Sequence, residues 1–241
     1  MILDTFPKVL WINLDRNLDR KKYMEALLDS YKITHFRIRA IDGMRLSDPE
    51  LETLCTKNLL LSRGENACTC SHIKALKYFL ENMSDDKVII FEDDVSFEFL
   101  SYISYDWSDL EKNLPENYDI IQLAINCDKY HVDYKLVKTN SDMRYFCSAA
   151  YLVTRNGATK LLDRYLPKKT QKIDLSNNPY PTADAMITST GNTFSIPIFT
   201  YATNQPLLKS MLHPSHYGMH NKSKDQQLKQ WIEISKEKKL I

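Results

Sequence analysis

The chain has 241 residues, of which 43% are hydrophobic, and this is enough for one large α/β domain, or two small ones, with a substantial core. Thirty-two Lys and Arg offset 31 Asp and Glu, so the formal net charge is only +1. Because no basic stretch interleaves with aromatic residues to suggest a nucleic-acid groove, we expect no nucleic-acid partner.

The first half of the chain alternates predicted strands and helices. Residues 9–14 form a near-continuous apolar run, as expected of a parallel strand that is buried on both faces. A helix is predicted over residues 19–30, and another begins after Ser62, where Glu65 three residues on gives the spacing of a capping box. Further strands are predicted over residues 35–41, 88–91 and 118–125. This order predicts an α/β domain with a mostly parallel central sheet flanked by helices.

The second half follows a looser pattern. The polar segment over residues 167–181 is expected to be a surface loop over a site. The remaining elements are predicted as a strand over residues 147–153, a helix over 156–165 and a strand over 194–201.

The tail over residues 223–241 is predicted to be a Lys-rich helix with an apolar stripe that includes Leu228, Trp231 and Ile234. Such a helix usually packs its stripe on its own domain, and lying at an anionic membrane surface is the alternative. We therefore predict one domain over residues 1–222 with this helix packed on it.

The five cysteines have neither the spacing of a disulfide framework nor the paired C-x-x-C spacing of zinc sites, so we expect reduced, mostly buried thiols. The N-terminus lacks the basic start, apolar stretch and cleavage site of a signal peptide. No apolar run approaches the roughly 20 residues of a membrane-spanning helix. These features predict a cytoplasmic protein without a transmembrane segment.

Three consecutive carboxylates, Glu92, Asp93 and Asp94, follow the strand predicted at residues 88–91. They would lie at the carboxyl edge of the sheet, where open α/β folds bind ligands. Repulsion makes the arrangement costly without a cation, and Mg²⁺ and Mn²⁺ are held by carboxylates and substrate phosphates. The triplet therefore predicts a divalent-cation site that carries a diphosphate. A polar loop after a strand is the alternative for the triplet taken alone.

Three upstream motifs accompany the triplet. In chain order the four are Ile12-Asn13-Leu14-Asp15-Arg16 with Asp19-Arg20, Ala40-Ile41-Asp42-Gly43, Gly64-Glu65-Asn66-Ala67-Cys68-Thr69-Cys70-Ser71-His72, and Ile90-Phe91-Glu92-Asp93-Asp94. Together they resemble glycosyltransferase family 25, which contains bacterial lipooligosaccharide galactosyltransferases and the procollagen galactosyltransferases that modify hydroxylysine. The resemblance thins beyond Val95, and Ala67 departs from the Gly that the family usually has before the Cys.

The resemblance implies a GT-A type nucleotide-binding fold, a UDP-sugar donor, and an Mn²⁺ or Mg²⁺ ion between the triplet and the donor diphosphate. Such an ion acts as a Lewis acid on the leaving nucleoside diphosphate. Asp94 is the first choice for direct metal contact. Glu92 is assigned to the same metal site, nearer the ribose or a metal-bound water, and Asp93 to donor binding.

The resemblance places four residues on the donor nucleotide, all at the end of the first strand or just after it: Asn13, Leu14, Asp15 and Arg16. Arg16 has an alternative role as a structural ion-pair partner of Asp19.

The helix with Gly64 and Glu65 in its first turn could face a phosphate or a sugar hydroxyl with its free backbone N–H groups. A plain capping role for Glu65 is the alternative. His72 shares a helical stripe with Leu76 and Phe79, so it is predicted to be a hydrogen-bonded interior histidine and not a metal ligand.

Asp184 is the candidate general base, because the family commonly has an acidic residue that opens a helix here, over the acceptor. Its alternative is an ordinary helix-start residue favoured by the helix dipole. Asp174 is the fallback candidate.

A histidine near the C-terminus completes the ion's shell in metal-dependent transferases of related fold, followed by a Gly and by a Lys that meets the diphosphate. His216 and Gly218, with Lys222 six residues after the histidine, resemble this pattern. His220 or His213 could replace His216 as the ligand, and a merely solvated loop is the alternative.

The motifs together predict a metal-dependent transferase that moves galactose or glucose from a UDP-sugar to an acceptor hydroxyl. The acceptor is hydroxylysine of a collagen-like protein, its galactosyl derivative, or a saccharide such as lipooligosaccharide. A non-catalytic accessory protein that binds a nucleotide sugar or a glycan is the alternative. A metal-dependent phosphoesterase would need a second cluster of carboxylates and histidines to hold two ions, and none precedes residue 92. The stereochemical outcome stays open, because an inverting transfer needs a base and a retaining transfer does not.

Overall fold

The computed structural model describes residues 3–126, 136–139, 147–169, 172–176, 178–202 and 214–237, with the backbone alone for 214–221 and 237. In chain order the elements are β1 (Val9–Asn13), α1 (Leu18–Ser30), β2 (His35–Arg39), α2 (Asp48–Leu54), β3 (Cys55–Thr56), α3 (Arg63–Asn82), β4 (Lys87–Glu92), β5 (Val95–Ser96), the 3-10 helix η1 (Glu98–Tyr102), α4 (Trp107–Lys112), β6 (Ile120–Ala124), β7 (Val137–Lys138), β8 (Ala150–Thr154), α5 (Arg155–Tyr165), β9 (Ile173–Asp174), α6 (Ala183–Thr188), β10 (Thr193–Tyr201) and α8 (Pro214–Glu237).

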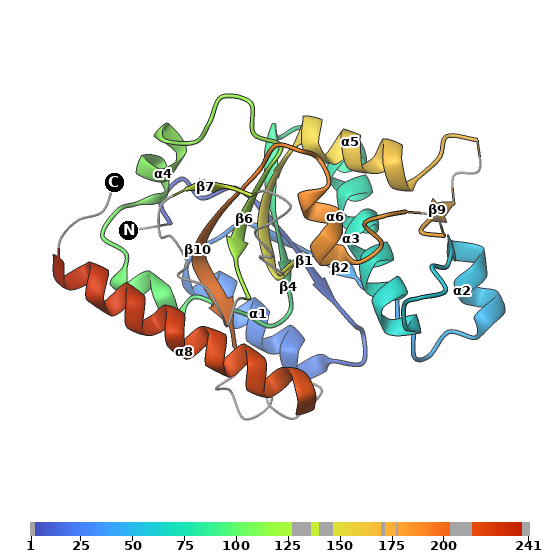
Figure 1. Ribbon diagram of the computed structural model, residues 1–241, viewed down its shortest axis with the longest axis horizontal. Helices are drawn as coiled ribbons and strands as arrows, with labels where there is room; N and C mark the ends of the chain where they lie inside the picture. The colour runs from blue at the N-terminus through green and yellow to red at the C-terminus, as the bar shows by residue number, and fades with distance from the viewer. Residues whose placement is uncertain are drawn as a thin grey trace.

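A central sheet with the strand order β2-β1-β4-β8-β6-β10-β5 runs through the molecule, and β7 pairs with β10 beside this path (Figure 1). Helices α3, α5 and α6 lie on one side of the sheet, and α1, α4 and α8 lie on the other (Figure 1). The prediction of an α/β domain with a central sheet flanked by helices is confirmed.

The direction of the strands divides the sheet. Pairs β1–β2, β1–β4 and β6–β10 are parallel, as predicted for the wound part of the chain. Strand β8 lies between β4 and β6 and is antiparallel to both, so the sheet is mixed at its centre. This reversal brings the beginning of β8 to the carboxyl end of β4, next to the acidic triplet.

Alternate side chains of the central strands enter two hydrophobic cores, as the two-residue period of a strand requires. Trp11 and Phe91 pack in the core with α1, η1 and α4, whereas Leu10 and Ile90 pack in the core with α3, α5 and α6. Because both faces are covered, β1 and β4 carry the near-continuous apolar sequences that predicted them.

The long C-terminal helix α8 packs on η1 and β10. Trp231 is fully buried, and its indole N–H donates to the backbone oxygen of Pro197 at 3.0 Å. The helix begins at Pro214 and continues without a break past residue 222. The predicted boundary between a domain over residues 1–222 and a terminal helix over residues 223–241 stays a prediction. No described helix is both long and apolar enough to cross a membrane.

The polar segment over residues 167–181 contributes to a second, two-stranded sheet. Here β9 pairs in parallel with β3, and the Leu175 N–H donates to the backbone oxygen of Thr56 at 2.9 Å. The described part of this segment is therefore tied to the chain just before α3. The four described cysteines are free thiols; Cys55, Cys70 and Cys147 are buried and Cys68 is half-buried.

Candidate active site

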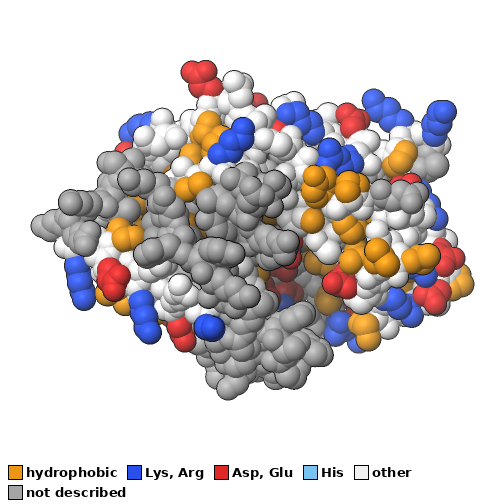
Figure 2. Space-filling model, in the orientation of Figure 1, with side chains coloured by type: hydrophobic (Ala, Val, Ile, Leu, Met, Phe, Trp, Pro, Cys, Tyr) orange, Lys and Arg blue, Asp and Glu red, His pale blue; other side chains and the backbone are white. Residues whose placement is uncertain are grey.

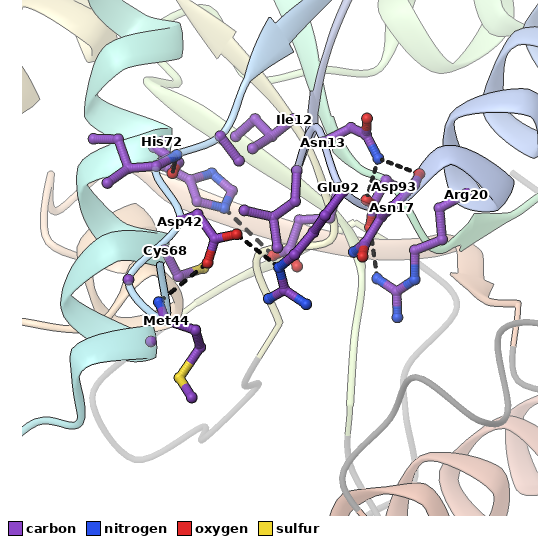
Figure 3. Close-up of a pocket in the computed structure, with 17 residues that line it drawn as sticks. Ile12, Asn13, Asn17, Arg20, Asp42, Met44, Cys68, His72, Glu92 and Asp93 are labelled. Atoms are coloured by element: carbon purple, nitrogen blue, oxygen red, sulfur yellow. Dashed lines mark hydrogen bonds and ion pairs between the residues drawn. The ribbon is translucent and has the colours of Figure 1, made fainter. Parts of the chain in front are cut away.

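A pocket opens at the carboxyl ends of β1 and β4, and all four motifs that carry the family resemblance contribute to its wall. Figure 2 shows acidic side chains at the bottom of a hollow near the centre of this face, and Figure 3 shows the pocket in close-up. Its lining residues from the four motifs include Asn13, Arg16, Asp42, Gly64, His72 and Glu92. Sequence segments that are up to 80 residues apart therefore meet at one edge of the sheet.

Parallel pairing of β1 with β4 explains the first contact at this edge. The register places Ile12 opposite Glu92, so the next residues, Asn13 and Asp93, leave the two strands side by side. The amide Nδ2 of Asn13 donates to Asp93 Oδ2 at 2.6 Å, and Arg37 Nε donates to Asn13 Oδ1 at 2.9 Å. Asn13 is buried. Because its amide oxygen accepts from Arg37 and its amide NH₂ donates to Asp93, the Asn13 side chain fixes the orientation of the Asp93 carboxylate.

Arg20, on α1, is the cation that accompanies the triplet. Its Nη1 lies 2.6 Å from Asp93 Oδ1 and 3.3 Å from Asp94 Oδ2. Burial lowers the pKa of Arg20, but the charges of Asp94 and Asp93 outweigh burial and raise it overall. The sequence prediction included Arg20 in a motif but gave it no role; its place in the first turn of the helix that follows β1 was the available signal.

The Asp94 carboxyl is incompletely satisfied. Its Oδ1 is buried and has no hydrogen-bond partner among the residues that the structure describes. Burial raises the pKa of Asp94 to about 7 against the opposing charge of Arg20, and the nearby carboxylates of Glu92 and Asp93 add to the increase. An orphaned, buried carboxylate oxygen next to two other acids is a fitting ligand for a hard divalent cation.

Glu92 lies between α3 and the beginning of β8. The Ser148 hydroxyl donates to Glu92 Oε1 at 2.6 Å, and His72 Nε2 lies 3.4 Å from the same oxygen. Burial is the largest influence on the pKa of Glu92 and acts upward, but His72 and Ser148 favour the charged form more strongly, so the pKa is lowered. Ser148 was not predicted, because only the antiparallel insertion of β8 brings it to the site.

Asp184 lies in the first turn of α6, where the Thr182 hydroxyl accepts a hydrogen bond from the Ala185 N–H as the cap. Burial raises the pKa of Asp184, the carboxylate of Glu92 raises it further, and hydrogen bonds from Ser148 oppose the increase. The side chain is thus close to Glu92 and Ser148. The fallback candidate, Asp174, lies in β9 and accepts hydrogen bonds from the Ser176 hydroxyl and N–H.

Of the three residues that follow β1, Leu14 and Arg16 line the pocket and Asp15 does not. Arg16 Nε donates to Asp42 Oδ2 at 2.7 Å, so its ion-pair partner in the structure is Asp42 and not Asp19. The exposed Asp15 accepts hydrogen bonds from Arg39 and Arg37, which lower its pKa.

The beginning of α3 is held by a capping box, as predicted: Ser62 Oγ accepts from the Glu65 N–H and Glu65 accepts from the Ser62 N–H. Gly43 packs directly on this helix, because an added Cβ would lie 2.4 Å from the Arg63 backbone oxygen and 2.8 Å from the Ala67 Cβ. Ala67, the departure from the family pattern, therefore lies where the second and third motifs meet. Only glycine allows this contact.

The C-terminal metal ligands stay predictions. His216 and His220 lie in α8, whose side chains are described only from residue 222, and His213 lies outside the described residues. Lys222 is exposed on the same helix.

An α/β fold whose ligand pocket lies at the carboxyl ends of parallel strands is typical of nucleotide-binding proteins. The sequence matches the family described as "Glycosyltransferase family 25 (LPS biosynthesis protein)" over residues 6–176, and the chain belongs to this family. The resemblance stated from the motifs is thereby confirmed.

Two curated relatives are procollagen galactosyltransferases. The chain is 28% identical to procollagen galactosyltransferase 2 of Homo sapiens over 142 residues, which is 55% of this chain and 20% of that protein. It is also 28% identical to procollagen galactosyltransferase 1-A of Xenopus laevis over 235 residues, which is 88% of this chain and 36% of that protein. The chain therefore spans only a minor part of the length of these relatives.

Similar solved structures include the galactosyltransferase LgtC in complex with donor and acceptor sugar analogs. The match has a TM-score of 0.42 and 12% identity and covers 90% of this chain and 83% of that one. A197 from STIV matches with a TM-score of 0.41 and 13% identity over 81% of this chain and 84% of that one.

Proposed function

We propose that the chain is a UDP-sugar-dependent hexosyltransferase that moves galactose or glucose to an acceptor hydroxyl. The observation that supports this most is the meeting of all four family motifs in one acidic pocket. Membership of glycosyltransferase family 25 supports the reaction class, and the names of the curated relatives favour galactose.

The charge of the triplet supports a divalent cation at this edge. Three carboxylates against the one guanidinium of Arg20 leave a formal charge of −2 when all are ionised, which one Mn²⁺ or Mg²⁺ would balance. Asp94 and Glu92 would hold the ion, with His216 or His220 as the predicted ligands from α8. When bound, the ion supplies Lewis-acid stabilisation to the leaving diphosphate.

The protein's own groups have separate tasks in this proposal. Asn13, Leu14 and Arg16 would bind the nucleotide where β1 ends, Asp93 would order that edge, and the exposed Lys222 would meet the diphosphate. Asp184 would take the proton of the acceptor hydroxyl. Its raised pKa suits this role, because a base works best when its pKa lies near the working pH.

The experiment that tests the proposal is a UDP-release assay with Mn²⁺ and a panel of UDP-sugars. Acceptors are a hydroxylysine-containing collagen peptide, its galactosylated form, and lipooligosaccharide. We expect acceptor-stimulated release with UDP-galactose or UDP-glucose. UDP binding by calorimetry with no release from any donor would contradict the transferase and support the accessory binding protein instead.

Two variants and one control assign the roles. Asp94→Ala should abolish the Mn²⁺ dependence together with turnover, whereas Asp109→Ala, on the distant surface helix α4, should leave both unchanged. Asp184→Asn should lower kcat by roughly 10²–10⁴-fold with little change in the KM of the donor if the transfer is inverting. An unchanged kcat would remove Asp184 as the base and favour a retaining transfer.

A further inference from the structure

Cys68 and His72 lie four residues apart in α3, and both line the pocket. Positions i and i+4 of an α-helix share a face. Glu92, at the end of β4, faces them, and the three possible donor atoms all lie within 4.8 Å of one another. Figure 3 shows the His72 ring directed toward Glu92, with Cys68 below it on the same helix. One helix and one strand thus bring together a thiol, an imidazole and a carboxylate.

The two ring nitrogens of His72 have different surroundings. The residue is 0% exposed, and its Nδ1 lies 3.1 Å from the Tyr151 hydroxyl, which confirms the predicted hydrogen-bonded interior position. Its Nε2 is buried and has no hydrogen-bond partner among the described residues. A buried polar atom left unsatisfied costs about 1–3 kcal/mol, so this nitrogen requires an explanation.

The spacing of the donor atoms agrees with a metal site. His72 Nε2 and Glu92 Oε1 are 3.4 Å apart. Nitrogen and oxygen ligands that each lie about 2.0–2.1 Å from one tetrahedral ion are themselves about 3.3–3.4 Å apart. The Cys68 sulfur lies within 4.8 Å of both other donor atoms, and a sulfur and a nitrogen bound to one tetrahedral ion are about 3.6 Å apart.

We propose that Cys68, His72 and Glu92 form a binding site for a borderline-soft divalent cation, with Zn²⁺ as the best fit. Thiolate and imidazole ligands select zinc over magnesium, calcium and manganese, which prefer oxygen ligands. On binding, the S–H bond of Cys68 breaks, the sulfur keeps the electron pair for the cation, and the proton goes to solvent. Three protein ligands leave a fourth position open toward the pocket.

The surroundings of the ligands resemble the outer shell of known zinc sites. A metal-bound histidine usually uses its other ring nitrogen in a hydrogen bond that orients the ring, and Tyr151 provides this contact for His72. Ser148 does the same for Glu92 by donating to Oε1. The competing explanation is a protonated His72 that pairs with Glu92, and that arrangement makes no use of Cys68.

The proposed zinc site and the proposed Mn²⁺ site both use Glu92, so zinc binding should inhibit the transferase; this expectation rests on the proposed function. Because Glu92 is also a predicted ligand of the activating Mn²⁺, zinc at Cys68 and His72 would remove that ligand and occupy the pocket. Zn²⁺ equimolar with Mn²⁺ should therefore lower UDP release by roughly ten-fold or more.

The direct test is titration of the full, reduced, metal-free chain with Co²⁺, a spectroscopic substitute for zinc. We expect one equivalent to produce a thiolate-to-cobalt charge-transfer band that Zn²⁺ removes. Cys68→Ser should lose the band and weaken Co²⁺ binding by roughly 100-fold or more. The matched control is Cys55→Ala, whose native thiol is buried in β3 and does not line this pocket, and this variant should keep the band. Absence of the band in the native chain, or its persistence in Cys68→Ser, would overturn the proposal.

A measurement on the unaltered chain covers the case in which Cys68→Ser does not fold. Crystals soaked in Zn²⁺ should show an anomalous peak between Cys68, His72 and Glu92, with the sulfur about 2.3 Å from the ion. A peak only at other residues would contradict the site. The two proposals fail separately: a cobalt band without turnover supports the site and not the transferase, and Mn²⁺-dependent turnover without the band does the reverse.

Discussion

Asp94→Asn is expected to make the metal-free protein more stable at neutral pH while it removes metal binding. Asp94 has a pKa raised to about 7, chiefly by burial, against an ordinary value of 3.8. The folded chain therefore binds a proton more tightly at this group than the unfolded chain does. Its contribution to stability is fully present below pH 3.8 and is lost as the pH rises to about 7.

The size of this loss follows from the two pKa values. A difference of about 3 between them corresponds to about 4 kcal/mol at pH 8 and to about 1.5–2 kcal/mol at pH 5. Asparagine cannot ionise, so the variant avoids this cost, although it loses the charge contact with Arg20 at 3.3 Å. We expect a net gain of about 1–3 kcal/mol at pH 8 and a gain smaller by about 2 kcal/mol, or none, at pH 5.

Asp93→Asn is the matched control, because it makes the same chemical change one residue away. The two oxygens of Asp93 accept separate hydrogen bonds from Asn13 and Arg20, both at 2.6 Å. An amide would turn its NH₂ group toward one of these donors, so we expect a loss of about 2–4 kcal/mol at both pH values.

Urea unfolding in EDTA at pH 5 and pH 8 measures both variants, provided that the m-value is unchanged. Saturating Mn²⁺, at about 100 times its dissociation constant, should stabilise the native chain by about 2.7 kcal/mol and leave Asp94→Asn unaffected. Three results would refute the reasoning: Asp94→Asn less stable than the native chain at pH 8 without metal, a difference that does not change with pH, or equal behaviour of the two variants.

Four further substitutions test how the site is held. Gly43→Ala should cost about 1–3 kcal/mol, because its Cβ would meet the backbone of α3. Gly64→Ala, whose Cβ would make only an ordinary contact of 3.9 Å with Ser62 Oγ, should be nearly neutral; thermal melts of the pair check this. Trp231→Ala should cost about 3–5 kcal/mol if α8 is part of the cooperative core, and a separate early transition in urea would contradict this. Ser148→Ala should cost about 1.5–3 kcal/mol by removing a hydrogen bond to a charged carboxylate, and equal stability of the two proteins in urea would argue against that bond.

The elements and residues that the sequence predicted well are those whose signal is local. Buried parallel strands carry continuous apolar runs, and β1 and β4 were found this way. The box at Ser62 gave the beginning of α3. Helix α2 had an equally clear signal that was missed, since Ser47 and Glu50 form a capping box with Pro49 in the first turn.

What the sequence could not predict depends on contacts between distant segments. Strands β5, β7 and β9 have two residues each and exist only because a partner strand accepts them. The reversal of β8 places Ser148 beside Glu92, and no pattern within residues 147–154 specifies that direction. The pairing of Arg20 with Asp93 likewise needs α1 to pack against the end of β4. The sequence motifs predicted the acidic edge of the sheet, whereas the topology determined that Ser148 and Arg20 contact its carboxylates.

The three acids of the triplet, although adjacent in sequence, differ in what already satisfies them. Asp93 has both oxygens in hydrogen bonds of 2.6 Å, and Glu92 is held by Ser148 next to His72. Asp94 shares Arg20 at the longer distance of 3.3 Å and keeps one buried oxygen without a partner. A cation can therefore take Asp94 without breaking the short contacts of Asp93. We infer that Asp93 orders the edge of the sheet, and that Asp94 offers the cation a buried oxygen that no described residue satisfies.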